Sequence, residues 1–335
     1  MFTLDLQNFW AGIIAFAVLA YVILDGFDLG VGILFPTTKS TDERDLMMNS
    51  VAPVWDGNET WLVLGGGGLL AAFPLAYAVA LPALYAPIMA MLVGLILRGV
   101  AFEFRWRTAR GKFIWDYSFF LGSLVAALAQ GVALGALVQG IPVANRAYAG
   151  GWWNWLTPFS ILTGVAVVVG YVLLGSTWLN MKTADALQLR MREIAKWAAI
   201  ALLILMGAVS LWTPFLQPAY YERWFTWPAM IYSLVVPFLV LVCALALFKG
   251  LALAKDVQPF IASLGLFIFT FVGLGISFYP YIVPPSLTIH DAAAPVSSLK
   301  FMLPGVLFLV PIIIVYTAYS YWVFRGKIDG KHGYH

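Results

Sequence analysis

The chain has 335 residues, of which 62% are hydrophobic and only 10% are charged, with a formal net charge of +3. Soluble domains are usually about 25% charged, so the composition excludes an ordinary soluble protein and indicates a polytopic membrane protein. A single cysteine, Cys243, excludes a disulfide framework within the chain and a cysteine-based metal site. We expect no metal site and no nucleic-acid partner.

Nine apolar segments are each close to the length of about 20 residues that a helix needs to cross a bilayer. In chain order they lie near residues 9–34, 53–72, 77–104, 114–138, 156–178, 196–215, 228–248, 258–279 and 301–324. The first segment lacks the basic flank of a signal peptide, which favours a retained helix. We therefore predict an all-α polytopic fold with nine transmembrane helices in a single integral membrane domain over residues 1–335.

The basic residues indicate how these spans are oriented. Most of the Lys and Arg residues fall in one set of alternate loops, whereas the other set holds only Arg146 and Arg223. By the positive-inside rule, the N-terminus is outside and the C-terminus is inside, which requires an odd number of spans. Tyr319, Tyr321 and Trp322 at the inner end of the last span are typical of anchors at the membrane interface.

The segment 279–300 is the longest predicted outer loop. Pro284, Pro285 and Pro295 exclude a helix along its whole length. A cover over the outer surface and a plain connector are equally consistent with this composition.

Six ionisable residues fall at membrane depth in the first three spans. They are Asp25, Asp28, Asp56, Glu59, Arg98 and Glu103. The direction of the three spans places all six in the inner half of the membrane. A charge at the bilayer centre costs at least about 2.5–3.5 kcal/mol, so such residues need a partner or have a function.

Two interpretations fit these residues. The first is a structural ion-pair network in which Asp25, Asp28 or Glu103 neutralises Arg98. That network cannot account for every acid, because five carboxyl groups face one guanidinium. The second is a proton pathway open to the inner side, with Asp56 and Glu59 nearest the water and Asp25 and Asp28 deeper.

The glycines bear on helix packing, and the histidines bear on haem binding. Gly26 and Gly30 form a GxxxG pair, which favours close helix packing. The three histidines all lie outside the predicted spans, with His290 in the outer loop and His332 and His335 in the C-terminal tail. Haem ligation by histidine inside this bundle is therefore not available.

Several segments carry a family resemblance across the whole chain. "LDGFDLGVGILFP", "NSVAPVWDGNETWLV" and "RGVAFEFR" resemble the signature segments of subunit II of the cytochrome bd family of quinol oxidases. "YPYIVPPSLTIHDAAAP" and "YTAYSYWVFRGKI" are similar to the same family and to its cyanide-insensitive branch.

The resemblance implies a fold and a partner. The expected fold is two four-helix bundles, roughly 1–138 with the charged network and 156–279, plus a peripheral helix at 301–324. The partner is a homologous subunit I that carries two b-type haems and one d-type haem, and we expect a small single-helix accessory subunit as well. The complex is expected in the bacterial cytoplasmic membrane, where it oxidises quinol and reduces O2 to water.

The resemblance also implies residue roles. In the family, the Asp of the WDG segment takes up protons from the inside, and here that residue is Asp56. Position 59 is Glu in this chain, whereas some members have Gln there. A neutral side chain therefore suffices in those members at the position of Glu59. Subunit II of some members holds a structural quinone, but no residue of this chain identifies such a site.

Two other classes of protein stay open. A proton-coupled secondary transporter also uses carboxylates at membrane depth, although it usually has inverted repeats and broken helices that we do not find in the sequence. A purely structural membrane scaffold would need the acids for stability alone.

Overall fold

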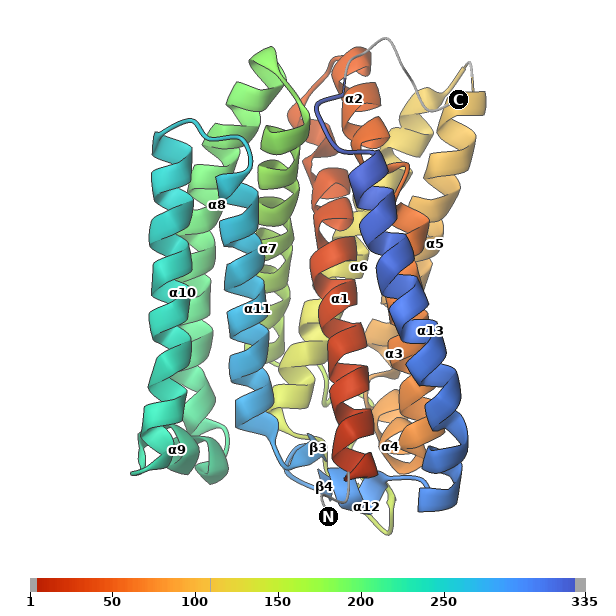
Figure 1. The fold of residues 1–335 in the computed structure, drawn as a ribbon, viewed down its shortest axis with the longest axis vertical. Helices are drawn as coiled ribbons and strands as arrows, with labels where there is room; N and C mark the ends of the chain where they lie inside the picture. Colours follow the sequence, from red (N-terminus) through yellow and green to blue (C-terminus); the bar gives the residue numbers. More distant parts are fainter. Residues whose placement is uncertain (1–4, 109, 329–335) are drawn as a thin grey trace.

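The structure is a computed structural model that describes residues 5–108 and 110–328. Long helices run side by side, with short connections at both ends (Figure 1). Eight helices in the described residues could each cross a membrane. They are α1 (Leu6–Leu34), α5 (Tyr85–Arg107), α6 (Lys112–Gln139), α7 (Pro158–Lys182), α8 (Asp185–Trp212), α10 (Ala229–Ala252), α11 (Gln258–Phe278) and α13 (Val296–Val323).

Helices α3 (Trp55–Ala72) and α4 (Pro74–Ala83) are bent by 120° relative to each other at Phe73. They form a ninth span if this bent pair is counted as one. The all-α polytopic fold is thus confirmed. The predicted third span, 77–104, was wrong in its first part, because the helix is interrupted at Leu84 and α5 starts only at Tyr85. Pro87 explains the break: it has no N–H for the carbonyl of residue 83, and its ring collides with that carbonyl.

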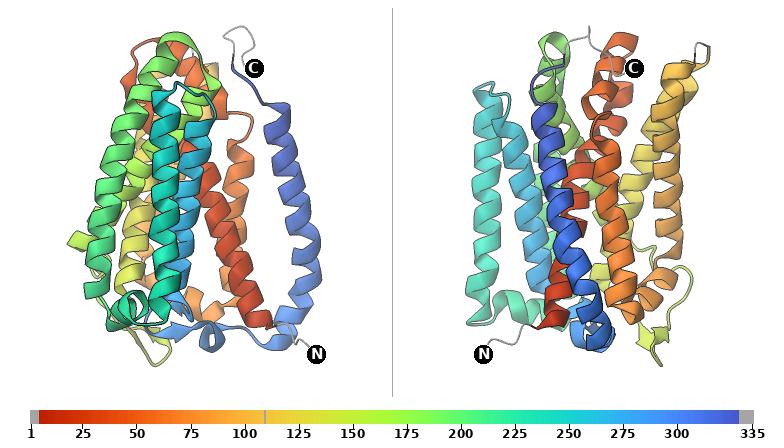
Figure 2. Two further views of the ribbon diagram at one scale, coloured as in Figure 1. Left: turned by 60° about the vertical axis from the view of Figure 1, so that its left-hand side comes forward. Right: turned by 45° about the vertical axis from the view of Figure 1, so that its right-hand side comes forward.

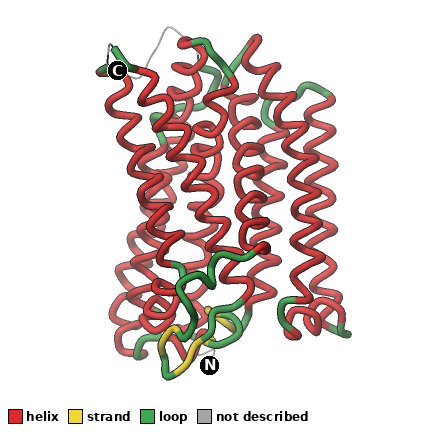
Figure 3. The backbone as a smooth tube through the Cα atoms, turned by 180° about the vertical axis from the view of Figure 1, so that it is seen from behind, coloured by secondary structure: helices red, strands yellow, loops and turns green. Residues whose placement is uncertain are grey.

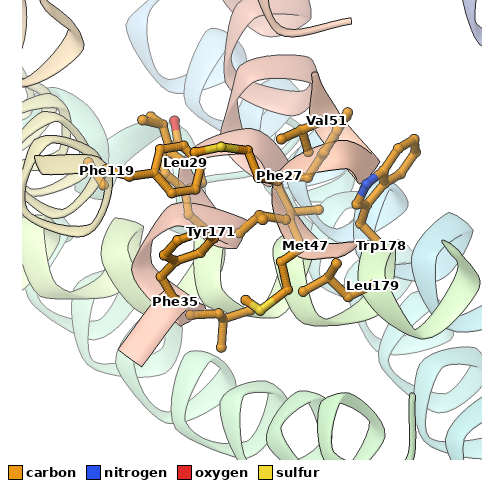
Figure 4. Close-up of a cluster of buried hydrophobic side chains, with 14 of the residues drawn as sticks. Phe27, Leu29, Phe35, Met47, Val51, Phe119, Tyr171, Trp178 and Leu179 are labelled. Atoms are coloured by element: carbon orange, nitrogen blue, oxygen red, sulfur yellow. The ribbon is translucent and has the colours of Figure 1, made fainter. Parts of the chain in front are cut away.

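The polar segment after the first span contains a helix that the sequence analysis treated as a loop. After a short 3-10 turn, η1 (Phe35–Thr37), helix α2 (Thr41–Val51) begins. The Ser40 side chain caps it by accepting a hydrogen bond from the Glu43 N–H. Its apolar face, with Met47 and Val51, packs on side chains of α1, α6 and α7 such as Phe27, Phe119 and Trp178 (Figure 4).

Small residues bring α1 against α7. Gly30 lies so close to α7 that a Cβ atom there would be 1.8 Å from the carbonyl oxygen of Tyr171. Gly175 of α7 approaches α1 in the same way, with a Cβ atom 2.4 Å from the carbonyl carbon of Gly30. The GxxxG pair therefore acts in helix packing, with Gly26 against the ring of Tyr171.

Gly30→Ala is expected to destabilise the protein, because the added methyl group meets backbone that cannot move aside. Overpacking typically costs about 1–3 kcal/mol, and contact with backbone places this site at the upper end. The measurement is the apparent melting temperature of the purified protein in detergent. Gly12→Ala is the matched control on the same helix, because no atom lies within 4 Å of its added Cβ. Equal melting temperatures for the two variants would contradict the packing role.

The end of the bundle opposite α2 is covered by short elements (Figure 3). They are the strand pairs β1 (Val143–Ala144) with β2 (Ala147–Tyr148) and β3 (Tyr281–Val283) with β4 (Leu287–Thr288), the helices α9 (Pro218–Phe225) and α12 (Ile289–Ala292), and the turn η2 (Thr213–Phe215). The segment 279–300 packs on the bundle rather than only connecting two spans. The N–H of Ala294 donates to the carbonyl of Ala72 at 2.8 Å, and the indole of Trp10 donates to the carbonyl of Leu299 at 3.2 Å.

Helix α13 lies at the edge of the bundle (Figure 2). Its most apolar window contains no buried residue, and it contacts α1 and α3. Most of its apolar surface is therefore free to face lipid or another subunit. The division of the remaining helices into two four-helix bundles stays a prediction.

Candidate functional site

A buried arginine lies at the centre of the charged site. The Arg98 side chain on α5 has no solvent exposure, and its Nη1 donates to Oδ1 of Asp25 on α1 at 2.6 Å. Its Nη2 pairs with Glu59 of α3, whose side chain is 27% exposed. A buried charge is tolerated only when it is paired, and these two contacts tie three helices together.

The local sequence explains why these side chains meet. On α1, Tyr21, Asp25 and Asp28 follow one another at helical spacing and all three are buried. On α5, Gly94 allows a close approach to Gly122 of α6, because a Cβ atom at Gly94 would be 2.6 Å from the carbonyl oxygen of Gly122. This approach holds the buried face of α5 inside the bundle.

Asp28 does not pair with Arg98, contrary to one of the predicted pairings. Its Oδ2 accepts a hydrogen bond from Nδ2 of Asn58 at 2.7 Å. The Oδ1 atom of Asn58 in turn accepts from the hydroxyl of Tyr321 on α13 at 2.9 Å. Tyr321 is half-buried, and its hydroxyl is engaged within the protein; its role as an interface anchor stays a prediction.

Glu103 was wrongly predicted to belong to the Arg98 network. Its side chain is 63% exposed and pairs with Arg107 one turn further along α5, at 3.6 Å. Residues 98 and 103 are five positions apart, which turns their side chains about 140° from each other on a helix. Glu103 therefore points away from the buried arginine.

Asp56 lies in the first turn of α3, exposed at the surface of the chain. Within the described part of the chain, its carboxylate has no hydrogen-bond or ion-pair partner, and only its carbonyl accepts, from Thr60 at 3.2 Å. Glu59 follows three residues later and reaches Arg98. The two carboxyl groups thus lead from the surface to the buried charges along one face of α3.

A polar extension continues from this site toward α7. The Nε2 atom of Gln130 on α6 donates to the Tyr21 hydroxyl at 2.8 Å, and the Tyr171 hydroxyl donates to Oε1 of Gln130 at 2.7 Å. Tyr21 is one helical turn from Asp25 on α1. The sequence analysis missed Gln130 and Tyr171, since neither carries a charge that would mark it at membrane depth.

A second ion-pair network lies at the α2 end of the bundle and was also missed. Arg105 is fully buried and donates to Asp45 at 2.5 Å and to Asp116 at 2.6 Å. Its signal in the sequence is the spacing of seven residues from Arg98, which places both arginines on one face of α5. Helix α2 is thereby fixed to α5 and α6.

The same end of the bundle holds an ion pair between α2 and α8. Nη1 of Arg190 donates to Oε2 of Glu43 at 2.6 Å, and the hydroxyl of Thr38 also donates to this carboxylate. The hydrogen bonds with Arg190 and Thr38 hold the pKa of Glu43 below its usual range. This acid is therefore ionised at neutral pH and helps to hold α2 in place.

The candidate ligands for haem or a metal ion are the histidine, cysteine and acidic side chains. Among the described histidines, His290 lies exposed in α12, outside the spans, with its Nδ1 beside Oε1 of Gln7; His332 and His335 lie outside the described residues. No group of three or more His, Cys, Asp or Glu side chains in residues 5–108 and 110–328 could hold a metal ion. The described spans contain no histidine.

The fold and the charged site together define a polytopic α-helical membrane protein with a buried ion-pair core. The family model for cytochrome bd terminal oxidase subunit II matches residues 6–324. The chain belongs to this family, and is thus one subunit of a cytochrome bd-type quinol oxidase complex.

Relatives and one solved structure agree over nearly the full length. Cytochrome bd-I ubiquinol oxidase subunit 2 of Escherichia coli K12 is 30% identical over 367 residues, covering 96% of this chain and 95% of that protein. Cytochrome bd ubiquinol oxidase subunit 2 of Bacillus subtilis is 30% identical over 339 residues, covering 98% of each. A chain in the structure of bd oxidase from Geobacillus thermodenitrificans has a TM-score of 0.72 at 18% identity, covering 96% of this chain and 99% of that one, which supports the fold.

Proposed function

We propose that this chain is a haem-free subunit II that stabilises the oxidase complex and carries protons from the cytoplasmic side toward a haem-bearing subunit I. The haems, two of b type and one of d type, would lie in subunit I, where quinol is oxidised and O2 is reduced to water. The placement of all three histidines outside the spans supports this division of labour.

The observation that carries the proton pathway is the position of Asp56. It is an exposed carboxylate at the start of α3, followed on the same face by Glu59, which contacts the buried Arg98–Asp25 pair. Asp25 and Glu59 contact the one guanidinium of Arg98, and Asp28 is a third buried carboxyl group one turn from Asp25 on α1. Charge balance in a low-dielectric interior favours a bound proton among them, which is the property a relay requires.

The assembly role rests on the exposed face of α3. Asp56 and Thr60 are exposed on it, and the Val63 side chain beyond them is 72% exposed. Polar groups at membrane depth are costly against lipid, so a protein partner is the better neighbour for this face. We propose that subunit I covers it, which would place Asp56 at the boundary between the two subunits.

The orientation follows from charge. The α2 end of the bundle carries most of the Lys and Arg residues, so we propose that this end faces the cytoplasm of a bacterial cell and that the N-terminus is outside. A small single-helix accessory subunit and a structural quinone belong to the same proposal; no described side chain identifies the place of either.

The chain expressed without its partner is expected to bind no haem, since no span supplies a histidine. The measurement is the absorption spectrum of the purified chain in the Soret region, beside the complex purified from cells that express both subunits. We expect a haem spectrum only in the complex. A stoichiometric haem band on the chain alone would contradict the haem-free assignment, and failure to recover any haem-bearing partner would contradict the proposed function as a whole.

A further inference from the structure

A cavity lies at the cytoplasmic end proposed above, beside the end of α13. Its volume is about 320 Å³, within the lower range of small-molecule sites. Its wall is formed by the end of α2 and its link to α3, by the end of α7, and by the last turn of α13 with residues 324–328 after it. We refer to it as the C-terminal cavity.

The described charges around the C-terminal cavity have one sign. Among residues 5–108 and 110–328, Lys182, Arg325 and Lys327 line it, and no acidic side chain does. Lys327 is neutralised in part by Asp256, which does not line the cavity; the distance from Nζ of Lys327 to Oδ2 of Asp256 is 3.0 Å. The described residues place no carboxylate within ion-pair distance of Lys182 or Arg325.

Lys182 is the deepest of these cations. The residue is only 6% exposed, and its Nζ donates to the carbonyl of Phe324 at 2.5 Å and lies 5.0 Å from the ring centre of Trp178. An ammonium has three N–H donors, and the described residues provide one hydrogen-bond acceptor for them. A buried ammonium without a carboxylate is costly, so an anion in the cavity would stabilise it.

The remaining wall suits a ligand with a polar head and an apolar body. Asn49 lines the cavity, and its Oδ1 atom, a hydrogen-bond acceptor, is buried without a partner in the described residues. Pro53, Val54 and Val323 supply the apolar part of the wall. The N–H of Ile328 donates to the carbonyl of Lys182 at 2.8 Å, which holds the C-terminal segment across the cavity.

We propose that the C-terminal cavity binds a phosphate group, held by Lys182 and Arg325, from the headgroup of an anionic phospholipid or from free phosphate. Cations arranged around an apolar-walled hollow at a membrane surface are the chemistry that recognises such a group. Neither Asp56 nor Arg98 lines this cavity, whereas Tyr321 does and links its wall to Asn58 of the charged site.

The test uses the assembled complex, purified in a non-ionic detergent and stripped of lipid. Binding of phosphatidylglycerol, phosphatidylcholine and inorganic phosphate is followed by native mass spectrometry. The test variant is Lys182→Gln with Arg325→Gln. The matched control is Lys39→Gln with Lys249→Gln, which removes two exposed cations at the same end of the bundle. Haem content and elution volume verify assembly, and Arg325→Gln alone, an exposed site, replaces the double variant if the latter does not assemble.

We expect phosphatidylglycerol to bind the wild type and the control alike, and the test variant at least tenfold more weakly. Competition by inorganic phosphate identifies free phosphate as a sufficient ligand, whereas binding of the anionic lipid without such competition identifies the headgroup as the source. Binding of phosphatidylcholine as tight as that of phosphatidylglycerol would overturn the proposal. So would equal affinities of the test variant and the wild type, or a wild type that binds neither anionic probe.

Discussion

Arg98→Leu is expected to remove most of the assembled, haem-complete complex from the membrane. The substitution leaves Asp25 buried without its counter-charge and releases Glu59, so α1, α3 and α5 lose the contact that joins them. Removing one partner of a buried ion pair typically costs about 3–5 kcal/mol. The measurement is the yield of the complex with its full haem content after mild solubilisation.

Arg107→Leu is the matched control for this experiment. It removes the same side chain from the same helix, but Arg107 is 79% exposed and pairs only with the exposed Glu103. Exposed pairs of this kind contribute about 0–1 kcal/mol, so near-normal yield is expected. If Arg98→Leu gave the same yield and haem content as Arg107→Leu, the buried network would not hold the complex together.

Asp56→Asn is expected to leave the haem spectrum of the complex near normal and to slow O2 reduction severely. The amide keeps the size of the carboxyl group and most of its hydrogen-bonding capacity, but it cannot take up and release a proton at neutral pH. The exposed position of Asp56 predicts little loss of stability. The measurements are turnover per haem-complete complex and proton uptake from the cytoplasmic side of proteoliposomes.

Glu103→Gln provides the comparison for Asp56→Asn, because Glu103 is another exposed carboxylate, placed on the face of α5 away from Arg98. It should keep wild-type turnover. A scaffold role for Asp56 predicts the opposite pattern, with haem lost and turnover per remaining complex unchanged. Wild-type turnover and proton uptake in Asp56→Asn would mean that protons enter through subunit I or through Glu59.

Much of the fold could be predicted from the sequence, because transmembrane helices are long and their apolar composition is easily recognised. The local break at Leu84 was missed because Tyr85 and its neighbours continue the apolar run without a polar interruption. Helix α2 was missed for the opposite reason. Its polar composition is that of a loop, and only tertiary contacts make it part of the bundle: packing of Met47 and Val51 on the core, and the ion pairs of Glu43 and Asp45.

The site was predictable as a set of charges but not as a set of contacts. Asp25, Asp28, Glu59 and Arg98 are conspicuous in apolar segments, and the structure brings them together. The spacing of five residues within α5 already places Glu103 away from Arg98. Which acid of another helix pairs with Arg98 depends on how the helices are rotated against one another. Contacts between distant segments, such as Tyr321 with Asn58, depend on tertiary packing that single-segment patterns do not contain.

The hydrogen bond between Tyr321 and Asn58 joins residues that are 263 positions apart, near the two ends of the chain. During synthesis, α3 enters the membrane long before α13 exists, so the Asn58 amide must first face lipid, water or a transient neighbour. The Asn58 amide oxygen gains the Tyr321 hydroxyl as its partner only when the last helix is in place. A chain that ends before α13 would therefore keep the Asn58 amide, beside Asp28, without its Tyr321 partner. The cell could distinguish such a chain from a finished subunit by that exposed polar surface.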